Sequence, residues 1–564
     1  MTKTLVSMHQ VKALWVLALV LVLPPTGHTQ SVPGQVVSSR AHLLADAGGV
    51  DGPLRDVLDR SVSEVGFGGS IRFESPDVWT YLPALEAAGV IFDQPGKPIC
   101  VGRVCSAFVP FDALEMLEFA PGVERVEPAW VPSFEPLMDT IEPLGAYDVQ
   151  TMGPVRGLTG AGVTIGDLDR PIDFYHPSFF NADGGTFEWF DQNENGEFDL
   201  GEPIDYDRDG EPSESEITSL LEGTQHWEGA LVSRWRNRDN GFTLGEDWVY
   251  LDLNQNGHRD YGTEAGFSDT DPAFGEPIFV ADNLNRNQRL DAGERFIALG
   301  SSKLSAVVWG NAQYYRGEDL TTADNANLGD LDRSHGTSVA GILAGGQGGR
   351  LDEIGIAPGS DLVSLINMAT PDGDQRILAM AAAQDLGIDI VIHEYGAWTW
   401  VAMDGSGNLE AAMDAARGMG QLQVNPAGNL ADSGKHTSVT ISSEPVDILF
   451  DVDDGFYGDL EVVYLSLHWP ATDEEVHIEI TVPGDDPVEF GAGGWLAATD
   501  NASLWSRTDR TARGMDMRDV LISPPSGEDV VTYGRYRLRV WTEASPRTLH
   551  AFLADPLSGW GRAE

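Results

Sequence analysis

The 564-residue sequence contains only two cysteines, Cys100 and Cys105, which stand close together in PICVGRVC with a glycine between them. No second pair of cysteines or histidines accompanies them, which disfavours a structural metal site. The spacing instead favours a small hairpin disulfide, a bond that persists in oxidising compartments.

Basic residues are also scarce, because 35 Lys and Arg stand against 88 Asp and Glu, a formal net charge of −53. This charge disfavours nucleic acid and anionic membrane surfaces as partners. Two interpretations remain open. The acidic residues form a solvated surface adapted to salt or solubility, or they favour cations and basic ligands.

Long apolar runs are absent beyond the N-terminus, so the sequence predicts no membrane anchor. Near the N-terminus, Lys3 and Lys12 precede the apolar run 13–23, which is followed by prolines and small or polar residues. This run is shorter than the roughly 20 residues that span a bilayer and has the layout of a secretory signal peptide. We therefore expect residues 1–30 to be a signal peptide and the protein to be extracellular or periplasmic.

The length predicts about three or four domains. Residues 31–137 mix short helix-like and strand-like stretches, which indicates a small α+β domain. In DALEMLEFAPGVERVEP, residues 112–128, Leu114, Leu117 and Phe119 form one apolar helix face. A Pro-Gly pair then separates this helix from an alternating strand.

Residues 138–432 show strands alternating with helices, which predicts an α/β unit with a parallel sheet covered on both faces. Within this unit, residues 187–300 differ in being acidic and rich in Asn and Gly, so they are interpreted as a loop-rich insertion. Residues 433–564 contain stretches such as VDILFDV and EVHIEITV that alternate with a period of two. They predict a C-terminal antiparallel β-sandwich or jelly roll.

Three short stretches of the α/β unit carry the groups of an acyl-transfer site. GVTIGDLDRPIDF places Asp169 at the carboxyl end of a strand, where ligands bind in open α/β sheets. SHGTSVAGILAGG puts His335 at the start of a helix, and QVNPAGN places Asn429 just past another strand. An aspartate, a histidine that it orients and an amide donor are three of the four groups that acyl transfer needs.

These stretches resemble the subtilisin-like serine peptidases, the subtilases, and they occur in the order found in that family. GIAPGSDLVSL and AAAQDLGIDIVIHEYG are similar to the family's core strand, core helix and substrate-binding edge. The resemblance implies a doubly wound parallel sheet and an endopeptidase with protein or peptide substrates. It also implies a zymogen whose residues 112–128 close an inhibitory propeptide domain. Asp169, His335 and Asn429 would be orienter, general base and oxyanion donor.

The sequence departs from this family pattern in two places. Arg170 and Pro171 follow Asp169 where the family usually has a small residue and a glycine. In addition, no G-T-S-M-A-x-P segment with the nucleophilic serine follows Asn429, and no G-x-S-x-G elbow replaces it. Ser338, three residues after His335, is interpreted as a packing residue.

We expect the missing serine segment to be absent from this chain rather than replaced, which leaves the sheet incomplete at its C-terminal end. The C-terminal sandwich resembles the inserted domain that some subtilases carry between Asn and Ser. The chain alone is therefore expected to be inactive. Two alternatives remain: a degenerate subtilase that is a non-catalytic, calcium-dependent extracellular binding protein, and an extracellular structural module held together by Ca²⁺.

The acidic insertion carries four candidate calcium loops. DQNENGEFDLGE (191–202) and DYDRDGEPSESE (205–216) place oxygen-bearing side chains at alternate positions around a glycine turn, the pattern that wraps Ca²⁺. DLNQNGHRDYGTE (252–264) is weaker because Glu264 falls one place late. NLNRNQRLDAGE (283–294) has Gln288 where glycine is expected. The candidate ligands are Asp191, Asn193, Asn195, Asp199, Glu202, Asp205, Asp207, Asp209, Ser213, Glu216, Asp252, Asn254, Asn256, Asp260, Asn283, Asn285, Asn287, Asp291 and Glu294.

Two further sequence features are given no catalytic role. His176 in YHPSF is interpreted as structural. His393 and Glu394 are adjacent on a predicted strand, so their side chains point to opposite faces and do not form a metal-binding pair.

Overall fold

The computed structural model describes residues 36–38, 41–42, 44–45, 62–63, 65–92, 98–129, 157–221, 241–284, 287, 289–326, 334–351, 354–367, 374–428, 433–452, 462–491 and 495–555. The expected signal peptide, residues 1–30, lies outside these ranges. None of the helices within them has the length and apolar character needed to cross a bilayer.

The centre of the molecule is a six-stranded sheet in the order β13-β12-β14-β6-β15-β16, parallel except for β13. The strands are β6 (Thr164–Asp169), β12 (Leu304–Trp309), β13 (Ala312–Tyr315), β14 (Asp361–Ile366), β15 (Ile390–His393) and β16 (Leu422–Val424). The helices are α7 (Ser334–Ala344), α8 (Gln375–Asp385) and α9 (Asn408–Gly418).

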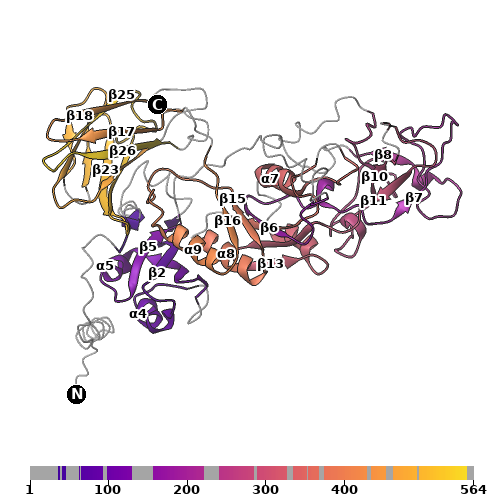
Figure 1. Cartoon of the computed structure of the whole chain (residues 1–564), viewed down its shortest axis with the longest axis horizontal. Coiled ribbons are helices and arrows are strands. Elements are labelled where there is room, and N and C mark those ends of the chain that lie inside the picture. The colour runs from indigo at the N-terminus through magenta and orange to yellow at the C-terminus, as the bar shows by residue number, and fades with distance from the viewer. Residues whose placement is uncertain are drawn as a thin grey trace, which may run out of the picture.

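Helices cover both faces of this sheet. Ile165 and Ile366 pack with α7 on one face, whereas Leu168 and Leu365 pack with α8 on the other. Figure 1 shows α7 on the opposite side of β6 and β15 from α8 and α9. Strands buried on both faces need apolar residues on each side, which explains their nearly continuous apolar runs. The predicted α/β fold with a parallel sheet covered on both faces is confirmed, and the structure adds the antiparallel edge strand β13, which was not predicted.

The acidic insertion folds around a second sheet, antiparallel and five-stranded, in the order β7-β11-β10-β9-β8. Its strands are β7 (Thr186–Phe187), β8 (Thr218–Leu220), β9 (Val249–Leu251), β10 (Ile278–Asp282) and β11 (Arg295–Ala298). An aromatic cluster that includes Phe187, Phe198, Phe279 and Phe296 packs on it. The sequence predicts only loops here, because strands of two to five residues are too short to show a period. The sheet nevertheless gives the acidic loops a fixed base.

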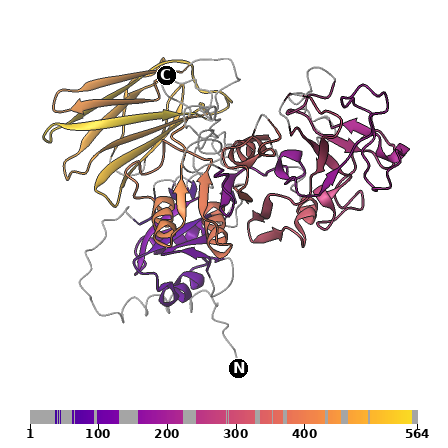
Figure 2. The same cartoon turned by 45° about the vertical axis from the view of Figure 1, so that its right-hand side comes forward.

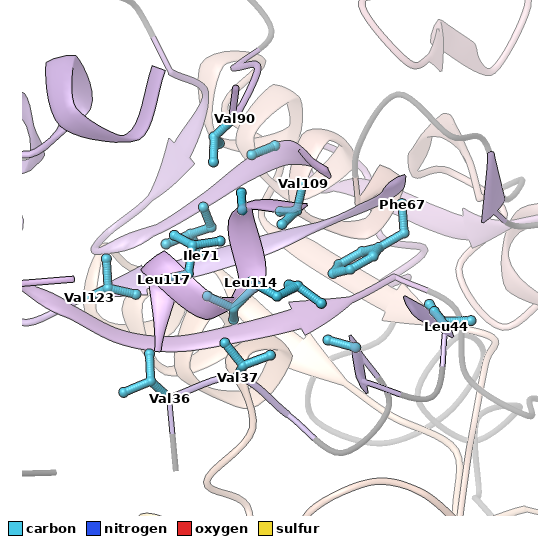
Figure 3. Close-up of a cluster of buried hydrophobic side chains, with 14 of the residues drawn as sticks. Val36, Val37, Leu44, Phe67, Ile71, Val90, Val109, Leu114, Leu117 and Val123 are labelled. Atoms are coloured by element: carbon cyan, nitrogen blue, oxygen red, sulfur yellow. The ribbon is translucent and has the colours of Figure 1, made fainter. Parts of the chain in front are cut away.

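In its described residues, the N-terminal unit is an antiparallel sheet with short helical segments packed on it. Its elements are β1 (Val62–Ser63), β2 (Gly66–Phe73), α4 (Leu82–Ala87), β3 (Cys100–Val101), β4 (Val104–Pro110), α5 (Leu114–Leu117) and β5 (Val123–Pro128). Figure 3 shows the core, where Ile71, Val109 and Leu117 meet. Cys100 and Cys105 form the expected disulfide across the β3–β4 hairpin. Phe119, expected on the buried face, is 67% exposed because the helix ends at Leu117.

Within the ranges given above, five short 3₁₀ segments connect these elements. They are η1 (Val78–Thr80), η2 (Phe111–Ala113), η3 (Pro177–Phe179), η4 (Glu214–Glu216) and η7 (Pro272–Phe274). A longer one, η8 (Leu320–Ala326), lies between β13 and α7.

The C-terminal unit is the expected antiparallel sandwich. One sheet has the order β17-β26-β19-β24-β23-β22 and the other β18-β25-β20-β21, with an apolar core between them. The strands are β17 (His436–Ile441), β18 (Val446–Val452), β19 (Val463–Pro470), β20 (Val476–Thr481), β21 (Val488–Glu489), β22 (Trp495–Ala498), β23 (Ser503–Arg510), β24 (Met515–Ser523), β25 (Gly534–Thr542) and β26 (Arg547–Ala554).

The N-terminal unit contacts the α/β unit and the C-terminal sandwich. Val101 and Val104 pack against α8 and α9, and Figures 1 and 2 show these helices lying on the N-terminal sheet. A second apolar cluster continues from the N-terminal core through Trp400 to Tyr464 and Trp505 of the sandwich. The acidic insertion lies at the opposite end of the molecule from the sandwich (Figures 1 and 2).

Candidate active site

Asp169 and His335 form a buried pair at the carboxyl end of β6. The His335 Nδ1 atom lies 2.8 Å from Asp169 Oδ1 and 2.7 Å from Oδ2. Asp169 is completely buried and His335 is 8% exposed. A carboxylate that accepts from Nδ1–H fixes the tautomer of the ring, so that Nε2 is the nitrogen available to act as a base. Two residues 166 positions apart thus form the arrangement that the sequence predicts.

The residues after each member of the pair hold it in place. A Cβ atom on Gly336 would lie 2.2 Å from the Arg170 carbonyl oxygen, so only glycine lets the start of α7 approach this turn. The Asp173 N–H donates to Thr337 Oγ1 at 2.8 Å, and Arg170 N–H donates to Asp169 Oδ1 at 2.6 Å. The unusual Arg170-Pro171 sequence therefore leaves the carboxylate in reach of the imidazole.

This close approach makes a prediction about two glycines of the same helix. Gly336→Ala is expected to destabilise the chain by about 1–3 kcal/mol, because the new methyl group forces the helix away from the Asp169 turn. Gly341→Ala is the control, since a Cβ there meets nothing within 4 Å. That variant should be stabilised by up to about 1 kcal/mol through helix propensity. Thermal unfolding measures both, and equal effects would contradict the close approach.

The other predicted residues of the site have different outcomes. Asn429 lies outside the described residues, so its place at the site stays a prediction. The residue before it, Gly428, is described and lies four residues past the end of β16. The carboxyl end of β16 is at the same edge of the sheet as the carboxyl end of β6. Ser338 is exposed on α7, which corrects its interpretation as a packing residue. His176 accepts the Ser178 N–H through Nδ1 at the start of η3, in agreement with a structural role.

Two carboxyl groups beside the pair were not predicted as site residues. Asp167 lies two residues before Asp169, and Glu394 follows β15, where its N–H donates to the Leu168 carbonyl. Burial, and then the neighbouring Asp169 and Glu394, raise the pKa of Asp167 well above its usual range. Burial, and then Asp169, raise the pKa of Glu394 to about 7 although His335 opposes this shift. Adjacent residues of a strand face opposite ways, so His393 instead contacts Gln423 at 2.8 Å.

Three of the four acidic loops share one backbone conformation. The fourth residue of each, Glu194, Arg208 or Gln255, has a φ of 55–61°, and the sixth is a glycine with a φ of 79–88°. Repetition of two left-handed positions at the same spacing gives the three loops the same turn. In the second loop, the carboxylates of Asp205, Asp207 and Asp209 lie within 4.8 Å of one another. These hard oxygen donors suit a cation such as Ca²⁺.

A glutamate closes each of these loops by accepting two backbone N–H groups. Glu202 accepts from Gln192 and Asp199, the second and ninth residues of the first loop. Glu216 accepts from Tyr206 and Ser213 at the same positions of the second.

In the third loop the closing residue is Glu276, which accepts from Leu253 and Asp260. Glu264, which falls one place late in the calcium-loop pattern, is exposed. Glu276 stands 24 residues after Asp252, so the fixed spacing of a calcium loop does not reveal it.

The fourth loop is described only in part. Asn285 lies outside the described residues. The Asn287 amide donates to Asp291 at 2.6 Å, and Glu294 accepts the Asp291 N–H. In the first loop Asn193 and Asn195 likewise donate to Asp199, so the side chains at these alternate positions converge in both loops.

The N-terminal unit supplies polar groups to the ends of α8 and α9. Glu127 accepts the Asn408 N–H at 2.7 Å at the start of α9, where the preceding Gly407 has no capping side chain. Ser106 Oγ accepts the Asp374 N–H at the start of α8. Because unpaired N–H groups and the positive end of the helix dipole favour acceptors, these contacts fix the unit on both helices.

Comparisons with known proteins identify the family. Among solved structures, the chain is similar to one described as the structure of the Clostridium perfringens CspB protease, at 13% identity and a TM-score of 0.41. The match covers 72% of this chain and 65% of that one. No curated protein matches the chain. Residues 160–509, more than half of the sequence, match the subtilase family, Peptidase_S8. The chain therefore belongs to the subtilase family.

Proposed function

We propose that this protein is a secreted serine endopeptidase of the subtilisin type. The observation that carries the proposal is the buried contact of 2.7 Å between Asp169 and His335 Nδ1 at the carboxyl end of a parallel strand. In this mechanism His335 Nε2 takes the proton from a serine hydroxyl as the oxygen attacks a peptide carbonyl. Asp169 stabilises the imidazolium, and the Asn429 amide donates to the oxyanion.

The serine of this mechanism is not identified in the chain. The test is expression of the coding sequence of the whole locus, including whatever follows codon 564, with hydrolysis of denatured casein as the readout. We expect a segment of the G-T-S-x-A-x-P type downstream, and hydrolysis that is lost in His335→Ala. A product that carries this segment and hydrolyses casein equally with His335→Ala would contradict the proposal.

The proposal includes calcium as a stabilising ligand of the acidic insertion. The donors are carboxylate and amide oxygens at alternate loop positions, as Ca²⁺ prefers, and in one loop three carboxylates lie within 4.8 Å. Bound Ca²⁺ would offset the repulsion among these carboxylates and brace the loops. It has no role in the proton transfers assigned to His335.

Calcium is expected to raise the unfolding temperature, and the third loop offers a sharp test. A site at 100 times its Kd stabilises by about 2.7 kcal/mol, or roughly 5–10 °C for a domain of this size. Glu276→Gln should reduce the calcium-dependent rise, because Glu276 closes the loop. The exposed Glu264 is the control, and Glu264→Gln should leave the rise unchanged. Calorimetry with calcium and with a chelator measures the shifts, and equal behaviour of the two variants would contradict the assignment.

We also propose that the N-terminal unit is an intramolecular inhibitor. Its contacts with the starts of α8 and α9 support this role, as does the family resemblance of residues 112–128. The disulfide between Cys100 and Cys105 agrees with an extracellular or periplasmic location.

A non-catalytic, calcium-dependent binding protein is the second candidate function. The acidic loops favour it, since their converging carboxylate and amide groups offer donors for a cation independently of the Asp/His/Ser mechanism. If no serine segment follows codon 564 and the chain binds denatured casein without cleaving it, the binding function replaces the peptidase.

A further inference from the structure

Asp167, Asp169 and Glu394 lie on the same face of the central sheet as Ser364. In the register of the parallel strands, Asp167 pairs with Ser364 on β14, and Leu168 pairs with His393, so Glu394 stands beside Asp169. This is the face that α7 covers, because Ile165 and Ile366 belong to the cluster that includes α7 residues. The polar residues therefore form a group on one face of the sheet that includes Asp169, the hydrogen-bond partner of His335.

This group is buried and incompletely hydrogen-bonded. Asp167 is fully buried, Ser364 is 1% exposed and Glu394 is 3% exposed. Both carboxylate oxygens of Asp167, Ser364 Oγ and Glu394 Oε2 make no hydrogen bond to any residue in the described ranges. Burial without partners disfavours a charge far more than a neutral acid, and a negative neighbour adds to this effect.

The two unassigned carboxyls differ in their surroundings. Asp167 lies deeper, between Ser364 and Ile392 of the adjacent strands, with Asp169 and Glu394 as negative neighbours. Glu394 lies at the end of β15, where His335 on α7 favours its charged form. Other titratable groups lie on or near these strands. Asp173, after β6, accepts the Tyr175 N–H, and Asp361 at the start of β14 pairs with Arg316. His393 points to the opposite face. Glu394 is therefore the carboxyl that loses its proton more readily.

We propose that Asp167 is held as a neutral acid and that Glu394 gains and loses a proton beside the Asp169–His335 pair, acting as a positioning residue that sets the charge of the imidazole. The proton of Glu394 passes to solvent as its carboxylate forms. The carboxylate then favours the imidazolium, which is the state that His335 reaches when it accepts a proton. This proposal rests on the proposed function only in treating that pair as catalytic.

The sign of the effect follows from the charges. Below the pKa of Glu394, about 7, the group is neutral and adds nothing to the field at His335. Above it, the negative charge stabilises imidazolium and raises the midpoint of the His335 titration. Because the two groups interact, they titrate as a coupled pair.

The test is an NMR titration of the full chain labelled with ¹⁵N-histidine, in which the His335 signals are assigned by their loss in His335→Asn. Glu394→Gln should lower the midpoint of the His335 titration by roughly 0.5–1 pH unit. Asp167→Asn is the matched control on the same face, and it should shift the midpoint by less than about 0.2 unit, since a neutral acid is replaced by a neutral amide. Asp169→Asn tests the pair itself and should also lower the midpoint.

The outcomes separate the inference from the proposed function. If Asp169→Asn lowers the midpoint and Glu394→Gln does not, Glu394 has no such role although the pair stands. If Asp167→Asn shifts the midpoint as much as Glu394→Gln, Asp167 is charged and the assignment of protons is wrong. If Asp169→Asn leaves the midpoint unchanged, the proposed function fails. If circular dichroism shows that Glu394→Gln is unfolded, Glu394→Leu is used in its place. Leucine removes both the charge of Glu394 and the cost of burying a polar group.

Discussion

The purified chain, residues 1–564 without further sequence, is expected to hydrolyse denatured casein about 10⁴–10⁶ times more slowly than an enzyme with a complete Asp/His/Ser triad. The physical reason is that His335 has no identified serine hydroxyl from which to take a proton. The measurement is casein hydrolysis together with labelling by a fluorophosphonate, which reacts with activated serines.

The labelling separates two sources of residual activity. We expect no labelled serine, and no difference between the chain and its His335→Ala variant. Cleavage that a fluorophosphonate abolishes, with a labelled serine that disappears in His335→Ala, would show that a nucleophile exists in the chain. The peptidase mechanism would then stand, and the expectation of a missing serine would be wrong.

Replacement of Arg125 by methionine is expected to cost about 3–5 kcal/mol in the free energy of unfolding. Arg125 on β5 of the N-terminal unit forms two hydrogen bonds to Asp509 on β23 of the sandwich, at 3.2 and 2.7 Å, and a third to Glu127 at 3.1 Å. All three side chains are at least nine-tenths buried. Methionine keeps much of the volume but removes one positive charge from the two buried carboxylates, Asp509 and Glu127.

Urea unfolding followed by tryptophan fluorescence measures this effect, because Trp400 and Trp505 lie in the same apolar cluster that joins the N-terminal unit to the sandwich. The double variant Arg125→Met with Asp509→Leu should recover part of the loss, since the pair is then removed as a whole. Arg535→Met breaks an exposed pair with Asp451 and is expected to have no measurable effect. An Arg125→Met variant as stable as Arg535→Met would show that the contact between Arg125 and Asp509 does not stabilise the packing of the N-terminal unit on the sandwich.

The α/β core and the Asp169–His335 pair could be predicted because their signals are local. The alternation of apolar runs and helical periods predicts a strand over 361–367, a helix over 376–386, a strand over 388–393 and a helix over 409–419. These lie within two residues of the observed bounds of β14, α8, β15 and α9. The sequence around His335 contains the glycine and threonine that hold it against the Asp169 turn, so the motif and the geometry have the same cause.

The strands β23 and β24 and the role of Glu276 were not predicted, because they depend on contacts between distant segments. β23 and β24 contain Asp509, Arg518 and Asp519, which are buried. Partners such as Arg125 and Ser466 make that burial possible, and they are far away in sequence. The apolar pattern of these strands is therefore broken. The role of Glu276 was not predicted for the same reason. It lies just before β10, far along the chain from the third acidic loop that it closes.

Glu394 illustrates a different limit. Strand geometry correctly placed it on the opposite face from His393, and this argued against a metal pair. The same geometry puts it beside Asp169, but that conclusion needs the register between β6 and β15. The order of strands in a parallel sheet is set by packing of the whole unit, so a single sequence does not reveal which carboxyls become neighbours.

A crystal structure with a bound peptide, at a resolution that defines the orientation of the Asn429 side-chain amide, would test the central claim most directly. The claim is that residues 169, 335 and 429 converge on one cleft. We predict that Asn429 Nδ2 and His335 Nε2 both face the same peptide carbonyl group, with His335 Nδ1 held by Asp169 as described. A peptide bound elsewhere, or an Asn429 amide directed away from the imidazole, would contradict the account.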